Sequence, residues 1–144
     1  NAIKLAKYNA KIQHIKNRIK FLNSDIDNFY GDKYDLIISN PPYVKLHKIN
    51  SLDRDIKSFE PKVALNGGVD GYTKIRLTIK KSSTLIKRKG KLFLEVGFDQ
   101  TRETLKLLKL NGFYTNKIVK DLANINRCLV STKIWIIYKS NEKF

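Results

Sequence analysis

Methionine is absent from this chain of 144 residues, and cysteine, proline and acidic residues are scarce. The single cysteine, Cys128, cannot form a disulfide within the chain, and His14 and His47 stand alone, so no zinc motif can be recognised. We therefore expect no metal site and a reducing compartment, the cytoplasm. The longest strongly apolar runs, around 36–38 and 134–138, are far shorter than the ~20 residues that cross a bilayer, which predicts no membrane span.

Basic residues outnumber acidic ones by 29 to 13, which gives a formal net charge of +16. A basic surface attracts RNA or DNA irrespective of base sequence. The lysines lie on almost every segment, however, and a lysine-rich solvated surface explains that spread equally well. Charge is therefore weak evidence, and we do not favour a nucleic-acid partner on this ground.

Helices and strands alternate in the hydrophobic pattern. Helical spacing of apolar residues predicts helices over 1–16, 72–86 and 101–110, with Asp70 as an N-cap and a short helix near 52–59 inside a long loop over 44–66. Strands are predicted over 18–22, 34–39, 92–97, 113–120 and 128–138, with residues 89–91 breaking the helix before the third of them.

This order predicts one α/β domain with a mostly parallel sheet and a C-terminal antiparallel hairpin formed by the last two strands. The chain opens with a helix that no strand precedes. A doubly wound domain normally begins with a strand, a glycine-rich turn and a helix. We therefore expect residues 1–144 to be the rear part of such a domain.

Asn40, Pro41, Pro42 and Tyr43 follow directly on the apolar strand predicted over 34–39. Ligands of open α/β sheets bind at the carboxyl ends of the strands, so this loop is the place to expect chemistry. The two prolines fix the backbone and cannot donate hydrogen bonds, which leaves a stiff loop that presents carbonyl oxygens. The Asn40 amide oxygen adds a second kind of acceptor, and Tyr43 adds a flat face for stacking.

Two fixed acceptors match the two hydrogens of a planar NH2 group. The nitrogen of an amide or an aromatic amine is a poor nucleophile because its lone pair is delocalised. Acceptors that hold both hydrogens can aim this lone pair at an electrophile, and positioning of this kind is worth ~7 to 11 kcal/mol. The pattern predicts transfer of an activated methyl group, as on a sulfonium, without a Ser, Cys or His nucleophile.

Four segments carry a resemblance to a known family. Asn-Pro-Pro-Tyr at 40–43 resembles the signature of S-adenosylmethionine-dependent amino-methyltransferases. The segments FEPKVALNGGVDG at 59–71, LFLEVGFDQ at 92–100 and KDLANINR at 120–127 are similar to those of the release factor glutamine methyltransferase family. The resemblance covers most of the chain after Arg18 and implies a Rossmann-like methyltransferase fold with S-adenosyl-L-methionine as cofactor.

The resemblance also implies a substrate and roles for particular residues. The substrate is the glutamine of the Gly-Gly-Gln loop in class I peptide chain release factors, methylated on N5. Asn40 and the Pro41 carbonyl would hold the glutamine amide, with Pro42 and Tyr43 completing the catalytic and substrate-binding loop.

Three further positions are assigned with less support from the motifs. Asp25 and Ile26 would lie near the adenine of the cofactor, whose methionine end would lie near Asn40. An Asp in this position is also often only a turn or cap residue. Glu60 would orient the catalytic loop against the substrate or would simply be exposed.

The family's glycine-rich cofactor turn, its ribose-binding acid and its N-terminal helical domain have no counterpart in residues 1–144. The glycines at 67, 68 and 71 lack the spacing of a dinucleotide-binding turn. We therefore expect a C-terminal fragment of the catalytic domain, which on its own binds the cofactor feebly or not at all.

Two alternatives to this function stay open. An exocyclic amino group of DNA or RNA, such as adenine N6, fits the same pair of acceptors, although the segment over 60–71 argues against it. The chain could also be an inactive remnant that serves only as a binding module. Glu95 is expected to be a paired structural carboxylate, and Arg127 to contact the core or an acidic partner.

Overall fold

The computed structural model describes residues 2–134 and divides into two compact units, Asn1–Tyr30 and Gly31–Phe144. The first unit contains the helix α1 (Ala2–Ile12) and two single turns of 3-10 helix, η1 (Lys16–Arg18) and η2 (Ile26–Asn28). The second contains the sheet and the remaining helices.

The strand predicted over 18–22 is wrong. Arg18 ends the turn η1, and residues 19–25 after it form neither a helix nor a strand. A strand needs a hydrogen-bonded neighbour, and none pairs with this segment among residues 2–134. The predicted first helix is confirmed as α1, although it ends at Ile12.

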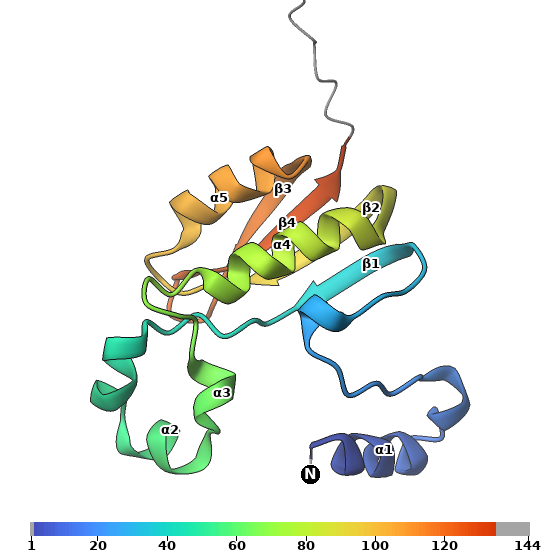
Figure 1. Ribbon diagram of the computed structural model, residues 1–144, viewed down its shortest axis with the longest axis horizontal. Coiled ribbons are helices and arrows are strands. Elements are labelled where there is room, and N and C mark those ends of the chain that lie inside the picture. The colour runs from blue at the N-terminus through green and yellow to red at the C-terminus, as the bar shows by residue number, and fades with distance from the viewer. Residues whose placement is uncertain (1, 135–144) are drawn as a thin grey trace, which may run out of the picture. The chain divides into compact units, whose positions relative to one another are not determined.

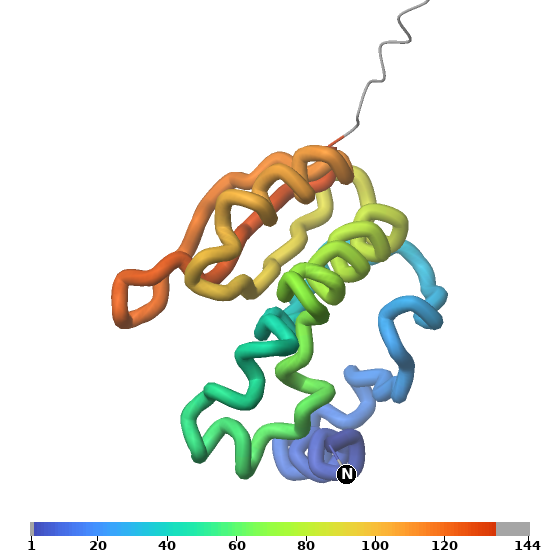
Figure 2. The backbone as a smooth tube through the Cα atoms, turned by 60° about the vertical axis from the view of Figure 1, so that its left-hand side comes forward, coloured from blue at the N-terminus to red at the C-terminus, as the bar shows by residue number. Residues whose placement is uncertain are grey.

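The second unit is built on a sheet of four strands, β1 (Tyr34–Ser39), β2 (Ile86–Glu95), β3 (Phe113–Lys120) and β4 (Asn126–Lys133), in the order β1-β2-β4-β3. β1 and β2 are parallel, whereas β2 with β4 and β3 with β4 are antiparallel. The α/β class and the C-terminal hairpin are therefore confirmed (Figure 1). Figure 2 shows the connection between β3 and β4, in orange-red, projecting from the end of the hairpin.

The sheet is mixed, which corrects the expected mostly parallel arrangement. Within the described residues, only the connection from β1 to β2 is a crossover between parallel strands. The segment over 18–22, which would have supplied another strand, does not pair. The part of the predicted last strand over 135–138 lies outside the described residues.

Two helices, α4 (Thr73–Leu85) and α5 (Thr101–Leu110), cover one face of the sheet (Figure 1). Their apolar residues step by three and four and bury themselves against alternate residues of the central strands. The resulting core consists of Ile75, Ile79, Ile86, Leu92, Leu94, Val96, Leu108, Phe113 and Leu129. Short elements connect β1 to α4, namely η3 (Leu46–Ser51), α2 (Arg54–Phe59) and α3 (Lys62–Leu65). The helix predicted near 52–59 is confirmed as α2.

The ends of α4 differ from the prediction. Asp70 accepts a hydrogen bond from the backbone N–H of Tyr72 at 2.9 Å, but Tyr72 itself occupies the N-cap position. The helix ends at Leu85, so the break predicted at 89–91 does not lie in the helix. The pairing of β2 with β1 is instead irregular between Ile86, opposite Tyr34, and Lys91, opposite Leu36, and Lys89 in this stretch has a φ of 63°. By contrast, α5 has the predicted bounds and ends as predicted, with Gly112 at φ 77° after the cap residue Asn111.

β1 is an edge strand within residues 2–134. Ile37 packs against the core, whereas its neighbours Leu36 and Ile38 on the opposite face are 47% and 71% exposed. An unpaired edge that carries exposed apolar residues is a template for pairing with another chain. β1 nevertheless holds its position through the parallel ladder with β2, from Leu36 opposite Lys91 to Ser39 opposite Leu94.

Candidate active site

The loop Asn40-Pro41-Pro42-Tyr43 begins where β1 ends, at the carboxyl edge of the parallel pair. Pro41 is buried, Pro42 and Tyr43 are half-buried, and Asn40 is exposed. Neither the Asn40 side chain nor the Pro41 carbonyl makes a hydrogen bond within the described part of the chain. Two acceptors on a stiff loop are therefore free to bind a donor from outside the protein.

Beyond the loop, the chain is tied to the segment that precedes α4. The Val44 N–H donates to the Leu65 carbonyl at 3.0 Å, and the Val44 carbonyl accepts from the Gly67 N–H at 2.9 Å. The Leu46 N–H donates to the Gly68 carbonyl at 2.9 Å. These bonds form a short parallel bridge, so the loop is held at both ends.

Glycines permit this close approach. A Cβ atom at Gly67 would lie 2.8 Å from the Cα and carbonyl carbon of Tyr43, and one at Gly71 would lie 2.8 Å from the Tyr43 carbonyl oxygen. Gly71 also has a φ of 80°, which L-residues with a side chain rarely adopt. The glycines that lack the spacing of a cofactor turn thus pack against the Asn-Pro-Pro-Tyr loop.

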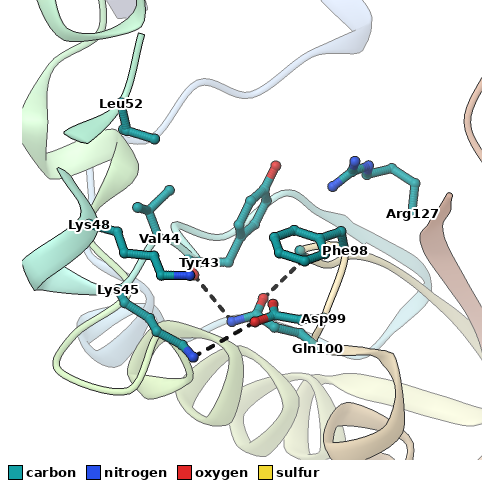
Figure 3. Close-up of a pocket in the computed structure, with 10 residues that line it drawn as sticks. Tyr43, Val44, Lys45, Lys48, Leu52, Phe98, Asp99, Gln100 and Arg127 are labelled. Carbon is teal, nitrogen blue, oxygen red and sulfur yellow. Dashed lines mark hydrogen bonds and ion pairs between the residues drawn. The ribbon is translucent and has the colours of Figure 1, made fainter. Parts of the chain in front are cut away.

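A cavity of about 210 Å³ opens beside Tyr43 (Figure 3). It is lined by Tyr43, Val44, Lys45, Lys48, Leu52, Gly97, Phe98, Asp99, Gln100 and Arg127. Lys45 and Asp99 form an ion pair across it at 3.7 Å, with both side chains partly exposed. The lining combines apolar walls with a few polar groups, as is typical of sites for small side chains or ligands.

The Tyr43 hydroxyl donates a hydrogen bond to Glu95 Oε1 at 3.1 Å, which fixes the orientation of the ring at the wall of the cavity. Burial raises the pKa of the Tyr43 hydroxyl above its ordinary value, and the negative charge of Glu95 raises it further. Tyr43 therefore stays protonated at neutral pH and acts as a donor. The prediction that Glu95 is a paired structural carboxylate agrees with this contact.

Arg127 reaches the cavity from the start of β4 (Figure 3). Its Nε and Nη2 donate to Asp121 Oδ2 at 3.1 and 3.0 Å, and its Nη1 donates to the Val96 carbonyl at 3.2 Å. The backbone N–H of Ile125 and the guanidinium of Arg127 hold the pKa of Asp121 below its usual range. Arg127 thus contacts both an acidic side chain, Asp121, and the backbone just after β2.

Of the predicted site residues, only Tyr43 lines this cavity, and Asn40, Pro41 and Pro42 precede Tyr43 on the loop without being among the lining residues. Asp25 caps the turn η2 in the first unit, where its carboxylate accepts from the Asp27 N–H at 3.4 Å, and Ile26 begins that turn. Glu60 is exposed at the end of α2. Their assignments to cofactor and substrate stay predictions. The sequence analysis assigned no role to Gln100. Its position shortly after the strand β2, at the sheet edge where β1 also ends, is the signal that could have identified it.

No group of three or more possible metal ligands occurs among residues 2–134. In the same range, every helix is too short or too polar to span a membrane.

The described residues form part of a Rossmann-like α/β fold, with the Asn-Pro-Pro-Tyr loop at the carboxyl edge of its parallel pair. The solved structure of TrmN from Thermus thermophilus shares the fold, with a TM-score of 0.57 and 19% identity over 92% of this chain and 33% of that one. Residues 1–142 match the family model described as Eco57I restriction-modification methylase, and the chain belongs to this family.

Curated relatives specify the resemblance further. The release factor glutamine methyltransferase of Thermodesulfovibrio yellowstonii is 38% identical over 133 residues, which are 92% of this chain and 47% of that enzyme. The corresponding enzyme of Clostridium acetobutylicum is 32% identical over 136 residues, or 92% of this chain and 48% of the relative. The predicted resemblance to this group is confirmed, and the chain spans about half the length of these relatives.

Proposed function

We propose that this chain supplies the catalytic loop of an S-adenosyl-L-methionine-dependent methyltransferase that modifies the N5 amide of a release factor glutamine. The observation that carries the proposal is the pair of uncommitted acceptors, Asn40 Oδ1 and the Pro41 carbonyl, on a loop fixed at both ends. The names of the curated relatives support the choice of a release factor glutamine as the substrate, and the family resemblance implies a class I release factor.

The loop performs the reaction by positioning. Asn40 and the Pro41 carbonyl would each accept one hydrogen of the glutamine NH2 group, which favours a pyramidal nitrogen and aims its lone pair. The ring of Tyr43, held by Glu95, would pack beside the planar amide. Oriented reactants can gain ~7 to 11 kcal/mol over free encounter, and the fixed carbonyl dipoles add to this as positive charge develops on the nitrogen.

The residues present fit part of the cofactor. Asp25 offers a carboxylate that can accept from an adenine amino group, and the exposed Asn40 offers an amide to the methionine end. That Asp25 and Ile26 lie near the adenine and Asn40 near the methionine end stays what the family resemblance implies. S-adenosyl-L-methionine supplies an electrophilic methyl group when bound. Gly67 and Gly71 pack against the backbone of Tyr43, so this glycine turn leaves no room for the ribose of the cofactor beside it.

Methylation of an exocyclic amino group in DNA or RNA is the second candidate. The description of the matching family as a restriction-modification methylase and the net charge of +16 are the observations that favour it. The glutamine substrate is preferred because several curated relatives carry that name, one of them at 38% identity. A release factor substrate also predicts that the enzyme acts in the cytoplasm.

The test uses the protein expressed from its own gene, with any residues that precede Asn1 included. Labelled S-adenosyl-L-methionine is incubated with the protein and either a class I release factor or DNA and RNA. We expect label on the release factor alone, and on its Gly-Gly-Gln glutamine in peptide mapping. Label on nucleic acid alone would establish the second candidate, and label on neither would favour an inactive binding module.

A further inference from the structure

Gln100 lies between β2 and α5 and is the N-cap residue of that helix. Its side chain is only 2% exposed, although it is polar and lies beside the cavity (Figure 3). A buried amide loses its hydrogen bonds to water, so it is retained at low cost only where the protein replaces those bonds.

The Gln100 side chain makes three hydrogen bonds to three different segments. Its Oε1 accepts from the Gly97 N–H at 3.0 Å, and its Nε2 donates to the Gly71 carbonyl at 3.0 Å and to the Tyr43 carbonyl at 3.2 Å. Both amide hydrogens are thus used. The side chain joins the end of β2, the glycine turn before α4 and the last residue of the catalytic loop.

The contact with Tyr43 fixes one peptide plane from both sides. The Tyr43 carbonyl accepts from Gln100, and the N–H of the same peptide unit, that of Val44, donates to the Leu65 carbonyl at 3.0 Å. The loop between this plane and the end of β1 contains only Asn40, two prolines and Tyr43. Because the prolines restrict the backbone, a displacement of the plane is transmitted to the acceptors upstream.

We propose that Gln100 is a positioning residue for methyl transfer, which holds the Tyr43 carbonyl so that Asn40 Oδ1 and the Pro41 oxygen converge on one nitrogen. This inference rests on the proposed function. Glutamine suits the role because its NH2 group can donate to two carbonyls while its oxygen accepts from a third segment. A carboxylate of the same shape would place an oxygen, which cannot donate, against the carbonyl oxygens of Tyr43 and Gly71.

Gln100→Glu makes that change with almost no change in volume. The matched control is Asn111→Asp at the other end of α5, because Asn111 Nδ2 donates to the Leu107 carbonyl at 2.8 Å and lies outside the cavity lining. Both variants replace an amide donor that faces a backbone carbonyl by a carboxylate. A loss that comes only from reduced stability should appear in both.

The first measurement is methyl transfer by the enzyme expressed from its own gene, at saturating cofactor. We expect Gln100→Glu to lower kcat about 10- to 100-fold, the scale of a misplacement near 1 Å, and Asn111→Asp to keep kcat within about twofold. The deficit of Gln100→Glu should shrink as the pH falls, because a protonated carboxyl group regains one donor. Equal kcat values in the two variants, or a deficit that is constant with pH, would overturn the proposal.

The second measurement is amide hydrogen exchange at Val44, which needs no substrate. We expect exchange at Val44 to be at least tenfold faster in Gln100→Glu and unchanged in Asn111→Asp. If Gln100→Glu does not fold, Gln100→Met keeps the volume, removes the amide group and takes its place in the comparison of kcat at one pH and in the exchange measurement. Slow exchange at Val44 in the variant would refute the role of Gln100. An inactive wild-type enzyme with fast exchange in the variant would instead refute the proposed function alone.

Discussion

Substitution of Gly71 by alanine tests whether the glycine turn shapes the catalytic loop. At a φ of 80° a residue with a side chain costs about 1 to 3 kcal/mol in backbone strain. The new Cβ would also lie 2.8 Å from the Tyr43 carbonyl oxygen, 2.9 Å from Gln100 Nε2 and 3.1 Å from Lys45 Cγ. Overpacking of this kind costs roughly 1 to 3 kcal/mol more. We therefore expect a total loss of about 2 to 6 kcal/mol.

Gly112→Ala separates the two contributions. Gly112 has nearly the same φ, 77°, but follows α5, remote in sequence from the loop and the glycine turn. Urea unfolding of both variants should show Gly71→Ala to be less stable than Gly112→Ala by about 1 to 3 kcal/mol. Amide exchange at Val44 should accelerate in Gly71→Ala only. Equal losses of stability in the two variants, together with unchanged exchange at Val44, would refute the role assigned to the turn.

Three further predictions concern individual side chains of the site. Asn40→Ala should lower methyl transfer by at least 10²-fold, and near-normal turnover would contradict the role of Asn40. The free energy of unfolding should change by less than about 0.5 kcal/mol, because Asn40 is exposed and makes no hydrogen bond within the described residues. Tyr43→Phe keeps the ring but removes the hydroxyl that donates to Glu95, so we expect the free energy of unfolding in urea to fall by about 1 kcal/mol and the KM for the substrate to rise. An unchanged KM would argue against a packing role for the oriented ring. Asp121→Asn should destabilise the protein at neutral pH, because the Asp121 carboxylate stabilises the fold only while it is charged. The difference in Tm from the wild type should therefore vanish as the pH falls through the lowered folded-state pKa of Asp121. A difference in Tm that persists in acid would show that charge is not the cause.

Elements with a strong local signal could be predicted from the sequence. β1 and α5 have the predicted bounds because apolar runs, turn residues and caps define their ends locally. The strand expected over 18–22 failed because extended structure depends on a pairing partner that local pattern cannot supply. The break at residues 89–91 was placed in a helix, but Ile86 pairs with Tyr34 and so already belongs to β2.

The same contrast applies to the site. The Asn-Pro-Pro-Tyr loop could be predicted because its stiffness and its acceptors are properties of four consecutive residues. Gln100 could not be assigned a role, because its contact with Tyr43 joins residues 57 positions apart. The packing of Gly67 and Gly71 against the loop likewise depends on how the segment before α4 folds back. Tertiary contacts thus determine how the loop is held, and the local sequence determines what the loop presents.

A crystal structure of the protein expressed from its own gene, with a glutamine-containing peptide bound, tests the central claim most directly. The measured quantities are the distances from the side-chain amide nitrogen of the peptide to Asn40 Oδ1 and to the Pro41 carbonyl oxygen. We expect both to be near ~2.9 Å, with the Tyr43 ring beside the amide. An amide nitrogen more than ~4 Å from either oxygen would contradict the claim that this loop holds both hydrogens of the methylated group.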